Sequence, residues 1–285
     1  MKVWLSVDME GISGLVRWAD VISTGMDFQR NRRFMTEDAN AAIAGAFDAG
    51  ASEVVVEENH GVEELCDLVL DEIDPRCSVV RGAGRPAATT MAGLTHDTAV
   101  VLFVGHHARA GSFPGIMAHT VAYERFSEVR LAGTPIGESE IMTIRAGELG
   151  VPVGLICGDQ VVCAELSKRA PWIETVCVKR ALSNVAAEVI PPARARDRIR
   201  AGARRAVERA RRGELPPYRD QPAPHEIEVD LRKPVEDELR ANLSRMPEFE
   251  LVDERRVRTL APDMDTGFRR IAYLSYGQRT RSTRY

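Results

Sequence analysis

The chain has 285 residues, of which 44% are hydrophobic, and it carries 38 basic against 42 acidic residues. This composition is typical of a globular protein with a full core, and it excludes a collagen, a coiled coil and a disordered chain. The formal net charge of -4 provides no overall positive field, so we expect no nucleic-acid partner.

Three features of the sequence indicate where in the cell the protein is located. The apolar start at residues 1–7 is interrupted by Asp8 and Glu10 before it reaches the length of a signal-peptide core. The longest apolar run, at 99–105, is far shorter than the ~20 residues that a membrane span needs. Five cysteines form no C-x-x-C pair, which is typical of reduced thiols. We therefore expect a cytoplasmic protein without a membrane partner.

The first 180 residues alternate short apolar runs with helical periodicity. This alternation predicts an α/β fold with a largely parallel sheet and crossover helices. We expect strands at residues 3–7, 54–56, 99–104 and 153–157. We also expect a helix that begins at Thr36 and ends at Gly50, and another over 141–149.

The composition changes near residue 190. A helix expected over 193–212 carries nine arginines and two acidic residues, which we interpret as a solvated face whose guanidinium groups pair with acids elsewhere. After it we expect a strand at 226–231, a helix near 235–244, two short strands within 248–260 and a last helix from 263. We predict a catalytic α/β domain over 1–190 and a smaller α+β region over 191–285, packed on it and contributing to oligomer contacts.

Acidic and imidazole side chains follow three of the predicted strands. Asp8 and Glu10 follow the first, His60 follows the second, and His106 and His107 follow the third. Ligands gather at the carboxyl ends of the strands of an open α/β sheet, so we expect these residues to share one crevice. Asp8 and Glu10 lie two positions apart and would leave an extended backbone on the same face, where only a cation offsets their repulsion.

Glu138 begins the predicted helix after a turn, and it is the fourth candidate. As an alternative, Glu138 or Glu140 is a first-turn acid that complements the helix dipole. Asp8, Glu10 and Glu138 would bring three negative charges, which two divalent ions and a bridging hydroxide balance. Mixed imidazole and carboxylate ligands suit zinc, although cobalt and manganese also fit such a site. The metals would activate water for hydrolysis.

Adjacent residues on a strand point to opposite faces, so only one of His106 and His107 is expected to reach the metals. His119 follows a glycine-containing loop and can come from the rim of the crevice, or it can be an ordinary buried or surface histidine. An acid near the rim, Glu58 or Glu140, is a candidate acceptor for a substrate amine.

Five motifs together resemble the zinc-dependent D-aminopeptidase family of the DppA type. They are SVDMEGISG at 6–14, His60 at its strand end, GHHARA at 105–110, PGIMAH at 114–119 and PIGE at 135–138. The match in order and approximate spacing covers about residues 1–190. Departures from the family pattern are His106, the run EEN before His60, and the segment with Trp18 and Asp20, and these surround the expected pocket.

The resemblance implies two Zn²⁺ ions per subunit, held by Asp8, Glu10, His60, His107 and Glu138, and a catalytic histidine at His119. It also implies that the enzyme removes N-terminal D-amino acids from short peptides and assembles as a homo-oligomer, a homodecamer. His119 would act as a general acid or base, or donate a hydrogen bond to the oxyanion. A metal-dependent amidase or deacylase, more remotely a phosphoesterase, and a non-catalytic peptide-binding protein are the alternatives.

Overall fold

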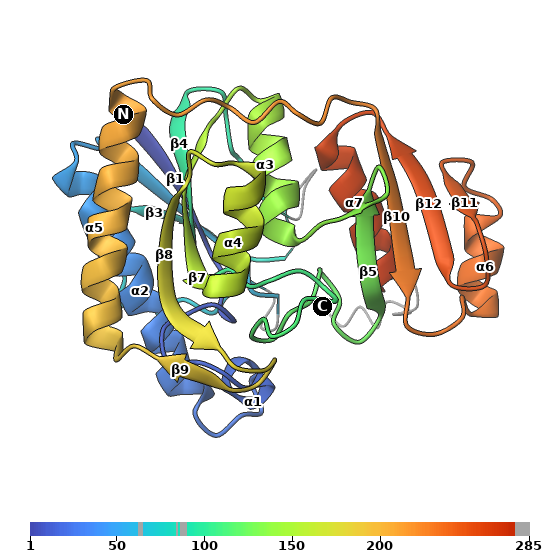
Figure 1. Ribbon diagram of the computed structural model, residues 1–285, viewed down its shortest axis with the longest axis horizontal. Helices are drawn as coiled ribbons and strands as arrows, with labels where there is room; N and C mark the ends of the chain where they lie inside the picture. Colours follow the sequence, from blue (N-terminus) through green and yellow to red (C-terminus); the bar gives the residue numbers. More distant parts are fainter. Residues whose placement is uncertain (62–64, 84, 86–89, 277–285) are drawn as a thin grey trace.

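The computed structural model describes residues 1–61, 65–83, 85 and 90–276, and it contains two sheets (Figure 1). The strands of the first sheet are β1 (Lys2–Val7), β2 (Glu53–Glu58), β3 (Ser78–Val80), β4 (Thr98–Val104), β7 (Val153–Asp159), β8 (Glu174–Ala181) and β9 (Ala187–Val189). Their order is β3-β2-β1-β4-β7-β8-β9, and every pairing is parallel except that of β8 with β9. The expected α/β class is confirmed.

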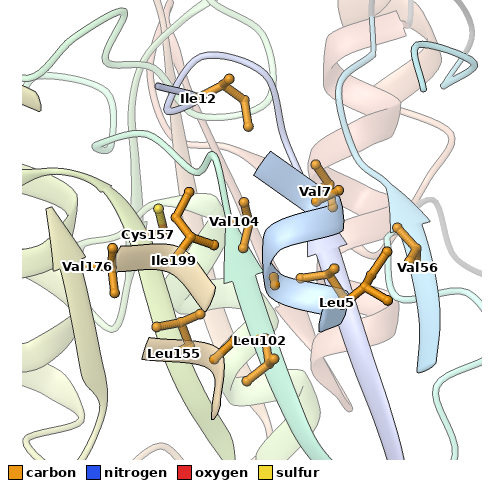
Figure 2. Close-up of a cluster of buried hydrophobic side chains, with 14 of the residues drawn as sticks. Leu5, Val7, Ile12, Val56, Leu102, Val104, Leu155, Cys157, Val176 and Ile199 are labelled. Atoms are coloured by element: carbon orange, nitrogen blue, oxygen red, sulfur yellow. The ribbon is translucent and has the colours of Figure 1, made fainter. Parts of the chain in front are cut away.

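Helices cover both faces of the first sheet (Figure 1). The helices α2 (Phe28–Asp48) and α5 (Pro192–Arg211) pack on one face, and α3 (Glu138–Glu148) and α4 (Gln160–Arg169) on the other. A short helix, α1 (Trp18–Val21), precedes α2. Figure 2 shows the core under α2 and α5, where Leu5, Leu102 and Leu155 from neighbouring strands are buried with Ile199 of α5. The buried strands are continuous apolar runs because both of their faces are covered.

The second sheet is antiparallel and lies beside the first (Figure 1). Its strands are β5 (Phe126–Leu131), β6 (Thr134–Pro135), β10 (His225–Leu231), β11 (Phe249–Leu251) and β12 (Arg256–Ala261), and its helices are α6 (Asp237–Leu243) and α7 (Met264–Tyr276). The strand order is β11-β12-β10-β5-β6. Because α3 contacts both α4 and α7, it joins the two layers.

The two sheets do not correspond to the segments before and after residue 190. The helix α5 packs on the first sheet, while β5 and β6 belong to the second. The division of the chain at residue 190 stays a prediction. No helix within the described part of the chain combines the length and apolarity that crossing a membrane would need.

The predicted start of the first long helix is wrong. Thr36 lies inside α2, which begins at Phe28, and its hydroxyl donates to the Arg32 carbonyl at 2.9 Å. The hydroxyl therefore bonds to the preceding turn of the same helix and does not cap a helix N-terminus. Phe28 and Met35 are buried, so the apolar face of the helix extends to its true beginning.

The arginine-rich helix α5 packs closely against α2. A Cβ on Gly45 would lie 2.2 Å from the Arg200 carbonyl oxygen, so only glycine permits this approach. The guanidinium groups pair with acids of neighbouring elements, as in the contacts of Arg200 with Asp48 at 2.7 Å and of Arg205 with Glu174 at 2.6 Å. The interpretation of these arginines as a solvated, ion-paired face is confirmed.

Candidate metal centre

The three strands that end in acids or histidines are neighbours, in the order β2-β1-β4. The strand order reverses at β1, and such a switch point is where open α/β sheets bind ligands. The loops after β1 and β4 touch, with the Gly11 amide donating to the Gly105 carbonyl at 2.7 Å. A Cβ on Gly11 would lie 2.0 Å from the His106 carbonyl oxygen, and Gly105 has a φ of +75°. These glycines bring Asp8 and Glu10 next to His107.

The first group of ligand-type side chains is Asp8, Glu10 and His60. The Nδ1 atom of His60 lies 3.1 Å from Glu10 Oε2 and 3.6 Å from Asp8 Oδ1. One ligand atom from each of the three residues lies within 4.8 Å of the others, and all three are buried. The group therefore has the composition and spacing of a metal site.

The second group is His107, His119 and Glu138, which meet the same distance limit. His107 Nε2 lies 3.4 Å from Glu138 Oε1, whereas His119 Nε2 is 4.0 Å from that oxygen and 4.0 Å from Glu10 Oε1. The rings of His107 and His119 stack at 3.9 Å. His119 thus lies at the edge of the cluster, between its two carboxylates.

Asp8 lies between the two groups. Its Oδ1 atom faces His60 Nδ1 at 3.6 Å, and its Oδ2 atom faces His107 Nε2 at 3.4 Å. The Asp8 carboxylate therefore presents one oxygen to each group. The cluster thus contains the five ligands and the catalytic histidine that the family resemblance implies.

Each of the three histidines has one ring nitrogen bonded to a backbone carbonyl. His60 Nε2 donates to Val21, His107 Nδ1 to Ala108 and His119 Nδ1 to Met117, at 2.8 Å, 3.0 Å and 2.8 Å. A carbonyl oxygen only accepts hydrogen bonds, so the ring nitrogen bonded to it carries a proton. When the ring is neutral, its lone pair is therefore on the other nitrogen, and that nitrogen faces the carboxylates. Hydrogen bonds of this kind orient the histidine ligands of metal sites. The residues fit divalent cations.

The electrostatics of the cluster favour positive charge. Burial alone would lower the pKa of His107, but the hydrogen bond and charge of Glu138 raise it to about 10. Burial would also lower the pKa of His60. The charge of Glu10 and a hydrogen bond to Asp8 outweigh burial and raise this pKa well above its usual value. Burial would raise the pKa of Asp8, which His60 and His107 nevertheless hold well below its usual range. The buried carboxylates thus attract a cation, either a proton or a metal.

The other candidate residues near the cluster, His106 and Glu58, both lie outside it. His106 lies away from the cluster, with Nε2 3.2 Å from the Ser6 hydroxyl, so His107 is the member of the pair that reaches it. Glu58 is fully buried and accepts from the backbone amides of Asp67 and Leu68.

Glu140 accepts from the Gly137 amide at 2.5 Å and pairs with Arg169 at 3.1 Å. The suggestion that Glu58 or Glu140 binds a substrate amine is therefore wrong, because both acids are already engaged. Glu140 instead caps its helix, as the alternative for the first-turn acids proposed. Its neighbour Glu138 faces the cluster and accepts from the Val121 amide at 2.7 Å.

The loop that carries His119 is held by residues that the sequence motifs did not indicate. Asp159, at the end of β7, accepts from the Ile116 amide at 2.6 Å through Oδ2 and caps α4 through Oδ1. Asn184 donates to the Gly115 carbonyl at 2.7 Å. Met117 has a φ of +46°, a strained conformation for a non-glycine residue that the surrounding bonds maintain.

Lys179 of β8 was also missed. Its side chain is buried, and the ammonium donates to the carbonyls of Glu10, Ile12 and Leu15 at 2.6, 2.9 and 2.6 Å. These three bonds fix the loop that carries Asp8 and Glu10. The available signal in the sequence was a lysine next to the apolar run at 176–178.

Comparisons with known proteins identify the family of this chain. A model of peptidase family M55, described as D-aminopeptidase, matches residues 1–273. A D-aminopeptidase of Bacillus subtilis (strain 168) is 35% identical over 195 residues, which are 68% of this chain and 69% of the relative. The structure is similar to that of the Zn-dependent D-aminopeptidase DppA from Bacillus subtilis, a self-compartmentalizing protease, with a TM-score of 0.88, 27% identity and 99% of each chain covered. Since the family model spans almost the whole chain, the protein belongs to the D-aminopeptidase family of peptidases.

Proposed function

We propose that this chain is a di-zinc aminopeptidase that removes N-terminal D-amino acids from short peptides. The observation that carries the proposal is the carboxylate of Asp8, whose two oxygens face two separate groups of ligand-type side chains. One ion would be held by Asp8, Glu10 and His60, and the other by Asp8, His107 and Glu138. The Zn-dependent relative supports zinc as the metal.

Two zinc ions in this centre would supply Lewis acids that activate water and polarise the carbonyl of the scissile amide. His119 would move the proton, because its Nδ1 proton is committed to the Met117 carbonyl and its free Nε2 faces the cluster. Burial lowers the pKa of His119, which favours the neutral ring that can accept a proton.

The proton balance follows from this assignment. His119 Nε2 takes a proton from the attacking water while the water oxygen bonds to the carbonyl carbon. The ring then gives this proton to the leaving nitrogen as the carbon–nitrogen bond breaks. The products are a free amino acid and the shortened peptide. A group in this role typically contributes ~10² to 10⁴ in rate.

A substrate panel tests the proposal. The purified protein, stripped with a chelator and reloaded with zinc, is incubated with D-Ala-D-Ala, L-Ala-L-Ala, N-acetyl-D-Ala-D-Ala and D-alanine amide, and the products are separated by chromatography. We expect zinc-dependent release of D-alanine from D-Ala-D-Ala, with little cleavage of the L-peptide or the acetylated peptide. Cleavage of the acetylated peptide or the amide in preference to the free dipeptide would instead support an amidase or deacylase.

We also propose that the chain works as a homo-oligomer, a homodecamer. The family resemblance and the self-compartmentalizing relative support this assembly. Light scattering coupled to size exclusion should give a mass about ten times the 31.5 kDa of one chain. A monomer at micromolar concentration would contradict the proposal.

A further inference from the structure

Among the described side chains of the metal centre, those of His119 and Glu138 are the most exposed. The side chains of Asp8, Glu10, His60 and His107 are between 2% and 5% exposed. Those of His119 and Glu138 are 11% and 12% exposed. A peptide that reaches the centre therefore approaches past His119 and Glu138, and the residues beside them are in position to contact it.

Two aromatic side chains flank His119 on this side. The ring of Trp18 meets the His119 ring edge to face at 5.4 Å, and the Tyr123 ring packs on Trp18 at 4.2 Å. Tyr123 itself lies 6.4 Å from His119 and is 44% exposed. We call Trp18 and Tyr123 the aromatic wall.

The aromatic wall is fixed by the same bonds that organise the centre. Trp18 begins α1, and the Val21 carbonyl at the end of this helix accepts from His60. Tyr123 follows Val121, whose amide donates to Glu138. Its ring and carbonyl are held by Arg232, whose guanidinium lies 5.1 Å from the ring centroid and donates to the carbonyl at 2.7 Å. The wall is therefore a preformed apolar surface next to the reacting atoms.

We propose that Trp18 and Tyr123 form a subsite for an aromatic or large aliphatic side chain of the peptide, at one of the two residues that flank the scissile bond. This inference rests on the proposed peptidase function and names the class of substrate. A methyl side chain is too short to cover two rings, whereas a phenyl or leucyl side chain removes them from water. Apolar pockets discriminate by about 10- to 200-fold per added methylene, so the preference is measurable.

The first experiment compares kcat/KM for D-Ala-D-Ala, D-Phe-D-Ala and D-Ala-D-Phe with the zinc-loaded protein. We expect the wild type to prefer at least one of the phenylalanine peptides. In Trp18→Ala and Tyr123→Ala, kcat/KM for that peptide divided by kcat/KM for D-Ala-D-Ala should fall about tenfold or more. Trp18→Phe should keep the wild-type value of this ratio. Tyr123 is exposed, so its variant tests the wall even if Trp18→Ala does not fold.

The matched control is Tyr273→Ala, which removes one ring of the pair formed with Phe249 at 5.7 Å in the second layer. In this variant the ratio of kcat/KM for the phenylalanine peptide to kcat/KM for D-Ala-D-Ala should equal that of the wild type. The inference is wrong if the wild type prefers D-Ala-D-Ala to both other peptides, or if both alanine variants keep the wild-type ratio.

A second measurement separates this inference from the proposed function. Binding of D-phenylalanine and D-alanine to the zinc-loaded protein is measured by calorimetry. Tighter binding of D-phenylalanine by the wild type, lost in Tyr123→Ala, would support the subsite even if no peptide were cleaved. Equal affinities for the two amino acids would contradict the subsite even if D-Ala-D-Ala were a good substrate.

Discussion

At the scale of single residues, the roles of His119 and Asp8 can be separated. His119 is farther from the carboxylates than His60 or His107, with both of its contacts at 4.0 Å. We expect His119→Ala to keep the zinc content of the wild type and to lose about 10² to 10⁴ in kcat/KM on D-Ala-D-Ala. Zinc content is measured by mass spectrometry on protein dialysed against metal-free buffer.

Asp8→Ala is the comparison variant for this prediction. Since Asp8 lies between both groups, we expect its removal to lower the zinc content as well as the activity. A His119→Ala protein that binds one zinc ion fewer than the wild type would show that His119 is a ligand, and the assignment as proton carrier would be wrong.

Lys179 provides the second prediction at this scale. Lys179→Met keeps the length of the side chain but leaves the carbonyls of Glu10, Ile12 and Leu15 without their donor. Because these bonds orient the loop that carries Asp8 and Glu10, we expect the zinc affinity to fall by about 10- to 100-fold in competition with a chromogenic chelator.

Lys168→Met is the matched control for Lys179, because Lys168 is exposed on α4. It should bind zinc like the wild type. If Lys179→Met is folded by circular dichroism and also keeps the wild-type affinity, the ammonium has no part in positioning the ligands.

At the scale of elements, the contact between α2 and α5 depends on Gly45. An alanine there gains helix propensity of up to ~1 kcal/mol, but its Cβ would lie 2.2 Å from the Arg200 carbonyl oxygen. Backbone atoms on both sides leave no flexible group to move, so the steric cost should dominate. We expect Gly45→Ala to lower the free energy of unfolding by about 1–3 kcal/mol in urea titration. Gly61→Ala, where a Cβ would meet no described atom within 4 Å, should change this free energy little.

The elements differ in how far the sequence predicts them. The strands β1, β4 and β7 were predicted because a parallel strand covered on both faces is an uninterrupted apolar run. The elements expected after residue 190 are confirmed as α5, β10, α6, β11, β12 and α7. The strands β3 and β9, of three residues each, carry too little periodicity to be recognised.

The pairing of β10 with β5 joins segments about a hundred residues apart, and no local pattern encodes it. The sequence predicted, for a different reason, that five ligand-type side chains cluster, namely Asp8, Glu10, His60, His107 and Glu138. These side chains follow the strands β1, β2 and β4 or begin α3, where parallel topology brings strand ends together. The bonds of Lys179 and Asp159 to the loops arise only from tertiary packing, so the sequence motifs gave no indication of them.

At the scale of the whole molecule, zinc binding should be linked to pH. In the metal-free protein the pKa of His60 lies well above its usual value and that of His107 is about 10, so both rings are protonated at pH 7. Zinc binds only neutral imidazole, so loading releases about two protons per chain. The affinity should therefore increase from pH 6 to pH 8.

Calorimetric titration of the metal-free protein in buffers of different ionisation enthalpy measures this release. Zinc uptake that releases no protons at pH 7, or an affinity that decreases as the pH rises, would contradict the arrangement of the two buried histidines around the carboxylates.

The most direct test is an anomalous diffraction experiment at the zinc absorption edge on crystals of the zinc-loaded protein. We predict two peaks per chain, one on each side of the Asp8 carboxylate and about 3.5–4 Å apart. The first should contact Glu10 and His60, and the second His107 and Glu138. A single peak in this cluster, or zinc bound elsewhere with the cluster empty, would contradict the two-metal centre.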